Sequence, residues 1–265
     1  MRKPLFAALV FTSCFGFQAF AGANPITRLF PRDLSFHVTF DDETVNPSLG
    51  VTPITRVSKR PQGGYSFADG LFGKGMTVGW PGWKVDRESP IIDMSRPGTA
   101  ICWVKLVKTP KPRDAIGRKW EAGGGFFSAR DDNGNAYLFG KSTDCGVGNG
   151  QVWFHCFAKR ENGIGVNTWC SSPCSFNDWV EGTWRMFAFS WTADALCVSV
   201  DGAPFTSRPC PMPLGELKPT ILSFRGVASG KPGWWIVDEC SVLTRKLSDE
   251  EVRVLYEETR KESGT

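Results

Sequence analysis

The stretch that decides the fold is IVDECSVLTRKLSDEEVRVLYEE, residues Ile236–Glu258. The segment Trp234–Leu243 has the composition of a β-strand, rich in apolar and β-branched residues. Ser248 is a good helix N-cap, and Glu251 follows three residues later, a spacing that predicts a capping box. A strand followed by a short helix is therefore expected, and the seven acids of the stretch must be divided between them.

The acids of the helical part are interpreted as helix-start residues rather than catalytic groups. Asp249, Glu250 and Glu251 lie in the first turn, where the helix dipole favours negative charge. The apolar face of the helix follows at helical spacing and comprises Val252, Leu255, Tyr256 and Thr259.

Asp238 and Glu239 lie within the strand, so they are expected to point to opposite faces of the sheet. Asp238 shares its expected face with Cys240 and Val242. A carboxylate on an apolar face must be paired, protonated or bound to a metal ion. Two interpretations stay open: a hydrogen-bonded structural acid, or a calcium ligand, because Ca²⁺ binds carboxylate and backbone oxygens.

The rest of the chain indicates an all-β domain with many turns. Its 265 residues include 29 glycines and 18 prolines, and clear helical periodicity appears only at the end. The net charge of +4, without a long run of one sign, argues against a nucleic-acid partner. The main predicted strands are 34–40, 100–107, 123–128, 136–140, 151–158, 184–191, 195–200, 221–224 and 234–243.

The first residues resemble an export signal. A basic MRK precedes the apolar PLFAALVF, and Ala19-Phe20-Ala21 fits a cleavage site, which predicts a signal peptide over 1–21. Residues 22–32 are then expected to be a linker and 33–260 the folded domain. The alternative is a lipoprotein anchored at Cys14. No other segment suits a membrane span, so a secreted or periplasmic protein is expected.

The cysteine count supports an oxidising compartment. Nine cysteines are present, and the eight beyond the signal form an even set, which favours disulfides. Zinc is the alternative, but the spacing Cys170-x-x-x-Cys174 lacks a second ligand pair. The hypothesis is that Cys145 pairs with Cys156 across a hairpin and that Cys170 pairs with Cys174 within a loop. A weaker possibility pairs Cys102 with Cys240.

Five motifs in order resemble one known family. They are Phe40-Asp41-Asp42, the turn Gly70–Met76, the strand Thr99–Lys105, Trp184 with Val200-Asp201-Gly202, and the ending Val237–Cys240 with Leu247–Glu251. The chain is similar, over roughly residues 34–257, to the laminin-G-like, concanavalin-A-like jelly-roll domains common in exported bacterial proteins. The resemblance implies two packed antiparallel sheets with a short C-terminal helix. It also implies that a structural calcium would be held by Asp238, with Asp41 as a second candidate.

Catalysis has less support than binding. Glycosidases on this fold present carboxylates in a Glu-x-Asp-x-x-Glu pattern, because retaining chemistry needs two carboxyls about 5–5.5 Å apart. That pattern is not found, and His37 and His155 are interpreted as structural. A noncatalytic module that binds a glycan or an extracellular protein is therefore favoured, with a polysaccharide hydrolase or lyase as the alternative.

Exposed tryptophans are the expected ligand contacts, since an indole face can stack on a sugar ring. Trp80 and Trp83 flank Pro81-Gly82 in a predicted loop, and Trp169 lies between cysteines in another. Trp184 and Trp191 are assigned to the core.

Overall fold

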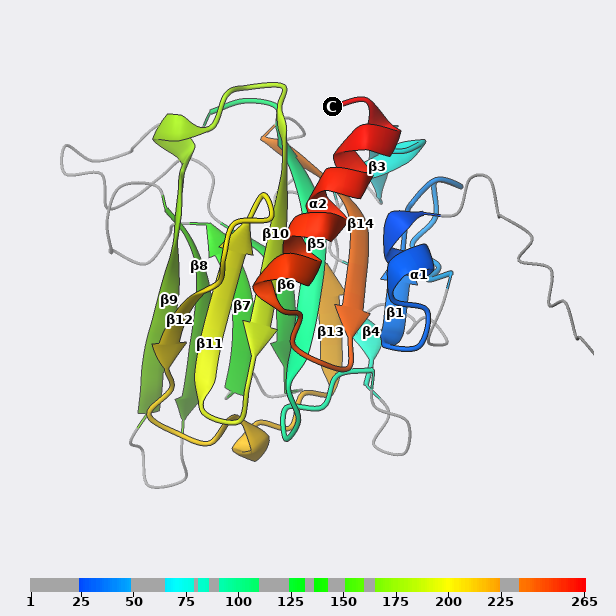
Figure 1. Cartoon of the computed structure of the whole chain (residues 1–265). Helices are drawn as coiled ribbons and strands as arrows, with labels where there is room; N and C mark the ends of the chain where they lie inside the picture. Colours follow the sequence, from blue (N-terminus) through cyan, green and yellow to red (C-terminus); the bar gives the residue numbers. More distant parts are fainter. Residues whose placement is uncertain are drawn as a thin grey trace, which may run out of the picture.

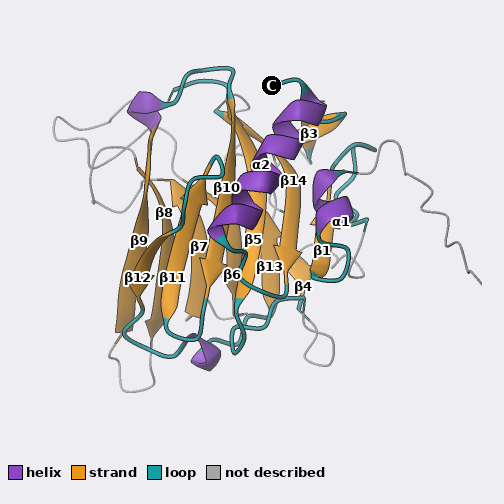
Figure 2. Cartoon of the chain, in the orientation of Figure 1, coloured by secondary structure: helices purple, strands orange, loops and turns teal. Residues whose placement is uncertain are grey.

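A computed structural model describes residues 24–48, 65–78, 81–85, 91–109, 124–131, 136–142, 151–159, 165–224 and 234–265. These residues form two antiparallel β-sheets packed face to face, with two α-helices on the outer side of one sheet (Figures 1 and 2). The expected signal peptide, Cys14, Trp80 and Cys145 lie outside the described residues. No helix in the described part is long and apolar enough to cross a bilayer.

The first sheet has eight strands in the order β12-β11-β10-β5-β14-β3-β2, and β1 also pairs with β14. Its strands are β1 Leu34–Val38, β2 Ser66–Asp69, β3 Lys74–Val78, β5 Gly98–Leu106, β10 Trp184–Trp191, β11 Ala195–Val200, β12 Thr206–Pro209 and β14 Trp235–Leu243.

The second sheet has six strands in the order β4-β13-β6-β7-β8-β9. Its strands are β4 Trp83–Lys84, β6 Gly124–Arg130, β7 Ala136–Ser142, β8 Gln151–Lys159, β9 Gly165–Ser175 and β13 Ile221–Phe224. Two short 3-10 helices, η1 Phe176–Asp178 and η2 Leu214–Glu216, lie in connections.

The core lies between the sheets and is dense in aromatic rings. Phe187 and Phe189 of β10 stack at 6.0 Å, and Phe127 of β6 stacks on Phe189 from the opposite sheet at 6.1 Å. All three side chains are fully buried. The period-two alternation expected for these strands is thus confirmed, because alternate residues fill the space between the sheets.

Helix α2, Asp249–Ser263, covers the outer face of the eight-stranded sheet (Figure 2). Ser248 and Glu251 form the predicted capping box, and Gly264 ends the helix in the left-handed conformation. Leu255 belongs to a second buried cluster with Ile101 and Met186 on the sheet's outer face. The all-β sandwich with a C-terminal helix is therefore confirmed.

The residues expected to be a linker contain a short helix, α1 Pro25–Leu29. Asn24 caps it and Pro25 begins it, two features that favour a helix start. Arg28 forms ion pairs with Glu258 and Glu262 of α2 at 3.1 and 2.6 Å. This segment is therefore packed on the domain along part of its length.

Strand bounds agree best where the alternation is regular: β10, β11 and β13 match their predicted ranges. Five strands have no predicted counterpart: β2, β3, β4, β9 and β12. Strand β4 was missed because Pro81-Gly82 predicted a turn at that point. Strand β9 was missed because the segment from Cys170 to Cys174 was interpreted as a loop, whereas its pairing with β8 makes it a strand.

The cysteine prediction is wrong for Cys170 and Cys174. Both lie in β9 rather than in a loop, and all seven cysteines of the described part are free thiols. Their thiols face different neighbours, since Cys170 Sγ donates to the Thr206 carbonyl at 3.3 Å and Cys174 lies near Arg185. The pairing of Cys156 with Cys145 stays a prediction, because Cys145 is outside the described residues.

Candidate functional site

The strongest concentration of polar chemistry lies at Asp238 and Glu239, in the middle of β14. The pairing of β14 with β5 shifts register between Asp238 and Ser241, and Glu239 has a φ of 51°. A left-handed non-glycine residue in a strand marks a β-bulge, which interrupts the alternation of side chains. Val237 and Cys240 therefore both face the core.

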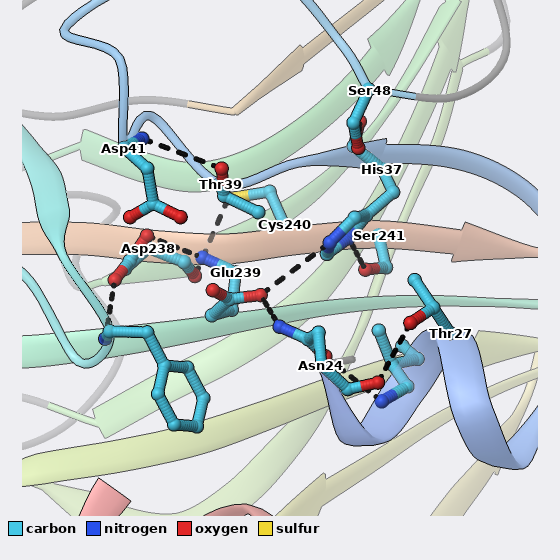
Figure 3. A network of polar contacts seen from close by, with 12 residues as sticks. Asn24, Thr27, His37, Thr39, Asp41, Ser48, Asp238, Glu239, Cys240 and Ser241 are labelled. Atoms are coloured by element: carbon cyan, nitrogen blue, oxygen red, sulfur yellow. Dashed lines mark hydrogen bonds and ion pairs between the residues drawn. The ribbon is translucent and has the colours of Figure 1, made fainter. Parts of the chain in front are cut away.

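This bulge corrects the expected orientation of the acids. Asp238 does not share the core face with Cys240, and Glu239 is buried against the N-terminal segment. Both carboxylates are buried at the edge of the sandwich, where β1, the start of α1 and the β2–β3 turn meet β14 (Figure 3).

Asp238 binds the backbone of the β2–β3 turn. Its Oδ2 accepts hydrogen bonds from the N–H groups of Leu71 and Phe72 at 2.8 and 3.4 Å, and its Oδ1 accepts one from Glu239 N–H at 2.8 Å. A Cβ on Gly70 would lie 2.5 Å from Asp238 Oδ2, so the turn needs glycine there. The hydrogen-bonded structural acid, one of the two sequence interpretations, accounts for these contacts.

Asp41 approaches the same turn from the end of β1. Its Oδ1 accepts a hydrogen bond from Lys74 N–H at 3.0 Å, beside Gly73, whose φ is 52°. Figure 3 shows the carboxylates of Asp41 and Asp238 pointing toward each other. Burial raises the pKa of Asp238 well above its ordinary value, and the neighbouring Glu239 and Asp41 raise it further.

Glu239 faces the opposite way, toward the N-terminal segment. It accepts a hydrogen bond from the Asn24 side chain, and its Oε2 lies 3.6 Å from His37 Nε2. Burial raises the pKa of Glu239 to about 8 and lowers the pKa of His37 to about 4. His37 is therefore neutral near pH 7, as a structural histidine, and its Nδ1 shares a hydrogen bond of 2.8 Å with Ser241.

Two facing carboxylates suit a hard cation better than a soft one, because their donors are oxygens only. No group of three or more His, Cys, Asp or Glu in the described ranges converges as a metal site. Asp41 and Asp238 could thus supply the charged oxygens of a calcium site, and backbone carbonyls or water would have to supply the others. The like charges facing each other are the observation that fits a cation here.

Of the tryptophans predicted to contact a ligand, Trp83 lies in the core and Trp169 lies at the surface. Trp83 is fully buried in β4, with its Nε1 donating to the Val45 carbonyl at 3.1 Å and its ring edge-on to Phe36 at 4.8 Å. It is a core residue, so the prediction that it stacks on a ligand is wrong. The Pro81-Gly82 signal concealed a short strand that delivers the ring to the interior.

Trp169 remains a surface candidate, although on a strand. It lies half-buried on β9, the edge of the six-stranded sheet, paired with His155 of β8. The guanidinium of Arg208, from β12 of the other sheet, lies 5.2 Å from the centre of its ring. Asn167 is exposed beside it on β9. Sequence reasoning missed Arg208, because only the tertiary structure brings the edges of the two sheets together.

Trp191 is buried as predicted, whereas Trp184 is half-exposed on the outer face of the eight-stranded sheet. Met186, two residues later on the same face of β10, is buried beneath α2, whereas Trp184 is the first residue of the strand.

No protein-family model and no curated protein matches this sequence. Solved structures share its fold at low identity. Domain 4 of an extracellular arabinanase from Geobacillus stearothermophilus, solved with arabinotriose, superposes with a TM-score of 0.53 at 18% identity, over 84% of this chain and 98% of that one.

Toxin domains are also similar. The binding domain of Paraclostridial Mosquitocidal Protein 1 has a TM-score of 0.60 at 13% identity over 84% of this chain. The binding domain of botulinum neurotoxin DC, solved with rat synaptotagmin II, has a TM-score of 0.61 at 10% identity over 86%. This chain spans 52% of the length of each toxin domain. These likenesses show a β-sandwich fold and do not single out the laminin-G-like type.

Proposed function

We propose that this chain is a noncatalytic binding module of an exported protein, of the laminin-G-like type, and that it binds a glycan at Trp169 and Arg208. The observation that carries the proposal is this tryptophan–arginine pair on the surface where the two sheet edges meet. An indole and a guanidinium together offer an apolar plane and several hydrogen-bond donors, which is what the face and hydroxyls of a sugar require.

The donors of Arg208 are available for a ligand. Its side chain is exposed, and it has neither an ion pair nor a side-chain hydrogen bond to any described residue. Asn167 adds an amide on the same strand as Trp169, with its Oδ1 held by His155 Nε2 at 2.5 Å. The amide nitrogen is thereby oriented away from the histidine.

The comparisons support binding in general terms. The arabinanase domain was solved with arabinotriose, and the neurotoxin domain with a protein, synaptotagmin II. A glycan is the proposed ligand for this chain because Trp169 and Arg208 form a small polar-aromatic surface rather than a broad apolar one. Arabino-oligosaccharides are a reasonable first probe.

We also propose that Asp41 and Asp238 hold a structural calcium ion. Calcium would neutralise two carboxylates that otherwise repel each other at the β2–β3 turn. It would stabilise the edge of the sandwich rather than take part in ligand chemistry.

The binding proposal is tested by titrating the purified protein with arabinotriose and by screening a glycan array. Trp169→Ala and Arg208→Ala should each weaken glycan binding about tenfold or more, the usual effect of removing an aromatic or arginine anchor. Trp234→Ala is the matched control, because Trp234 is also half-exposed and carries Lys108 at 5.3 Å over its ring, at the start of β14.

Equal losses in Trp169→Ala and Trp234→Ala would contradict the assignment of the site. A reducing-end assay on the same polysaccharides distinguishes the alternative function, since release of new ends by the wild-type protein would make it an enzyme. If the purified protein binds a protein but no glycan, the proposed ligand class is wrong and a protein ligand takes its place.

A further inference from the structure

A hollow of about 460 Å³ lies beside the C-terminal half of α2, on the helix-covered face of the eight-stranded sheet. The ends of β5 and β10 form its floor and the turn after β11 one wall; in Figure 1 the C-terminal end of α2 and the start of β10 lie at the same end of the sandwich. This volume falls within the range of small-molecule sites. The lining side chains used below are Trp103, Trp184, Arg185, Asp201, Tyr256 and Arg260.

Aromatic rings give the hollow a flat apolar wall. Tyr256 of α2 stacks on Trp103 of β5 with centroids 5.7 Å apart and planes 11° apart, which fixes its ring. Trp184, half-exposed at the start of β10, adds a second indole. Such walls bind the apolar face of a sugar or a similar ring.

The charged side chains that line the hollow are Arg185, Arg260 and Asp201. Arg185 binds Asp201 through Nη1 at 2.8 Å and the Asp178 carbonyl through Nη2 at 3.1 Å. Its Nε is buried and has no acceptor within the described part of the chain. Arg260 lies with its guanidinium 5.6 Å from the Tyr256 ring centre, and its Nε donates to a main-chain oxygen of Thr265 at 2.8 Å.

The side chains that line the hollow include two arginines and one aspartate, and Asp201 already accepts two hydrogen bonds. Guanidinium groups bind carboxylates in a planar, two-pronged manner. A buried donor without an acceptor is costly in the free protein and is satisfied when an anionic oxygen enters.

We propose that this hollow binds one acidic sugar residue of the uronate type, with its carboxylate on Arg260 and the free N–H of Arg185 and its ring against Tyr256 and Trp184. The site is separate from Trp169 and Arg208, which lie on the edge strands β9 and β12 and do not line the hollow. It adds a preference for acidic over neutral sugars that the first site does not supply.

The experiment titrates the full chain with galacturonic acid and glucuronic acid, and with galactose and glucose as neutral partners, by NMR or calorimetry. Uronate binding should exceed hexose binding and weaken with salt, and Arg260→Gln should reduce uronate affinity at least tenfold. Arg253→Gln is the matched control, since Arg253 is an exposed arginine of α2 that does not line the hollow.

A second variant separates ring from charge: Tyr256→Phe keeps the stacked ring and should retain uronate binding. Trp169→Ala should leave uronate affinity unchanged, so that a failure at one site is distinguished from a failure at the other. The proposal is overturned if the uronates do not bind at millimolar concentration, if the neutral hexoses bind equally, or if Arg253→Gln and Arg260→Gln behave alike.

Discussion

Asp238 and Glu239 show how much one backbone angle decides at the scale of a residue. Regular alternation would send neighbouring carboxylates to opposite faces. The left-handed φ of Glu239 instead buries both, Asp238 against the β2–β3 turn and Glu239 against Asn24 and His37. Two adjacent acids thereby tie three separate segments to the last strand.

The calcium proposal makes a residue-scale prediction. In metal-free protein, added calcium should raise the melting temperature, because an ion bound only by the folded state stabilises it. Asp238→Asn and Asp41→Asn should abolish that rise. Asp42→Asn is the matched control, since Asp42 is exposed and, among the described residues, its carboxylate accepts hydrogen bonds only from Thr44. Melting curves that do not change with calcium or EDTA would contradict the site.

Glu251 carries a pH prediction. Hydrogen bonds from Arg245 and Ser248 lower the pKa of Glu251 to about 2. Because the folded pKa is below the unfolded one, the stabilisation is present above about pH 4.5 and is lost as the pH falls toward 2. Glu251→Gln should therefore cost about 1 kcal/mol at pH 7, a modest value for a partly exposed group.

That difference should shrink as the pH falls from 4.5 to 2, measured by urea unfolding at each pH. Glu257→Gln removes another acid of α2, one that pairs with exposed Arg253 at 2.5 Å, and should have a smaller effect. A loss in Glu251→Gln that is constant across this range would argue against the capping carboxylate.

At the scale of elements, α2 can be predicted from the sequence and β9 cannot. Helix α2 begins at a capping box formed by Ser248 and Glu251 and ends at the left-handed Gly264, so residues close in sequence define it. Strand β9 has no strong alternation and is formed because β8 offers it a paired edge. The first was predicted and the second was not.

Docking of α2 is the element-scale prediction. Leu255 is buried against the outer face of the sheet, so Leu255→Ala should lower the free energy of unfolding by about 2–5 kcal/mol. Val254→Ala, one position away and only half-buried, should cost less than about 1 kcal/mol. Denaturant unfolding measures both, and similar losses would mean that α2 contributes little through its apolar face.

At the scale of the whole molecule, the two faces of the sandwich differ. Helices α1 and α2 cover the eight-stranded sheet, whereas the edge strands β9 and β12 lie side by side at one side of the sandwich (Figure 1). Trp169 of β9 and Arg208 of β12 meet there. The helix-covered face still contains the hollow beside Tyr256. The architecture thus presents two separate polar-aromatic surfaces.

Trp83 and Trp169 give a prediction about the whole fold. Trp83→Ala removes a fully buried ring beside Phe36 and should lower the free energy of unfolding by about 3–5 kcal/mol. Trp169→Ala should change it by less than about 1 kcal/mol while weakening glycan binding. Equilibrium unfolding of the two variants would contradict this division if the losses were similar.

The sequence by itself determined the all-β class, strands such as β10 and β11, and the capped helix α2, because these depend on alternation and on contacts a few residues apart. The two-sheet arrangement and the candidates Asp238 and Asp41 came from the resemblance to a known family. The tertiary structure alone decided that Trp83 is buried, that β14 carries a bulge, and that Arg208 meets Trp169. Each of these depends on which strands become neighbours, and contacts between distant segments leave no periodic signal in the chain.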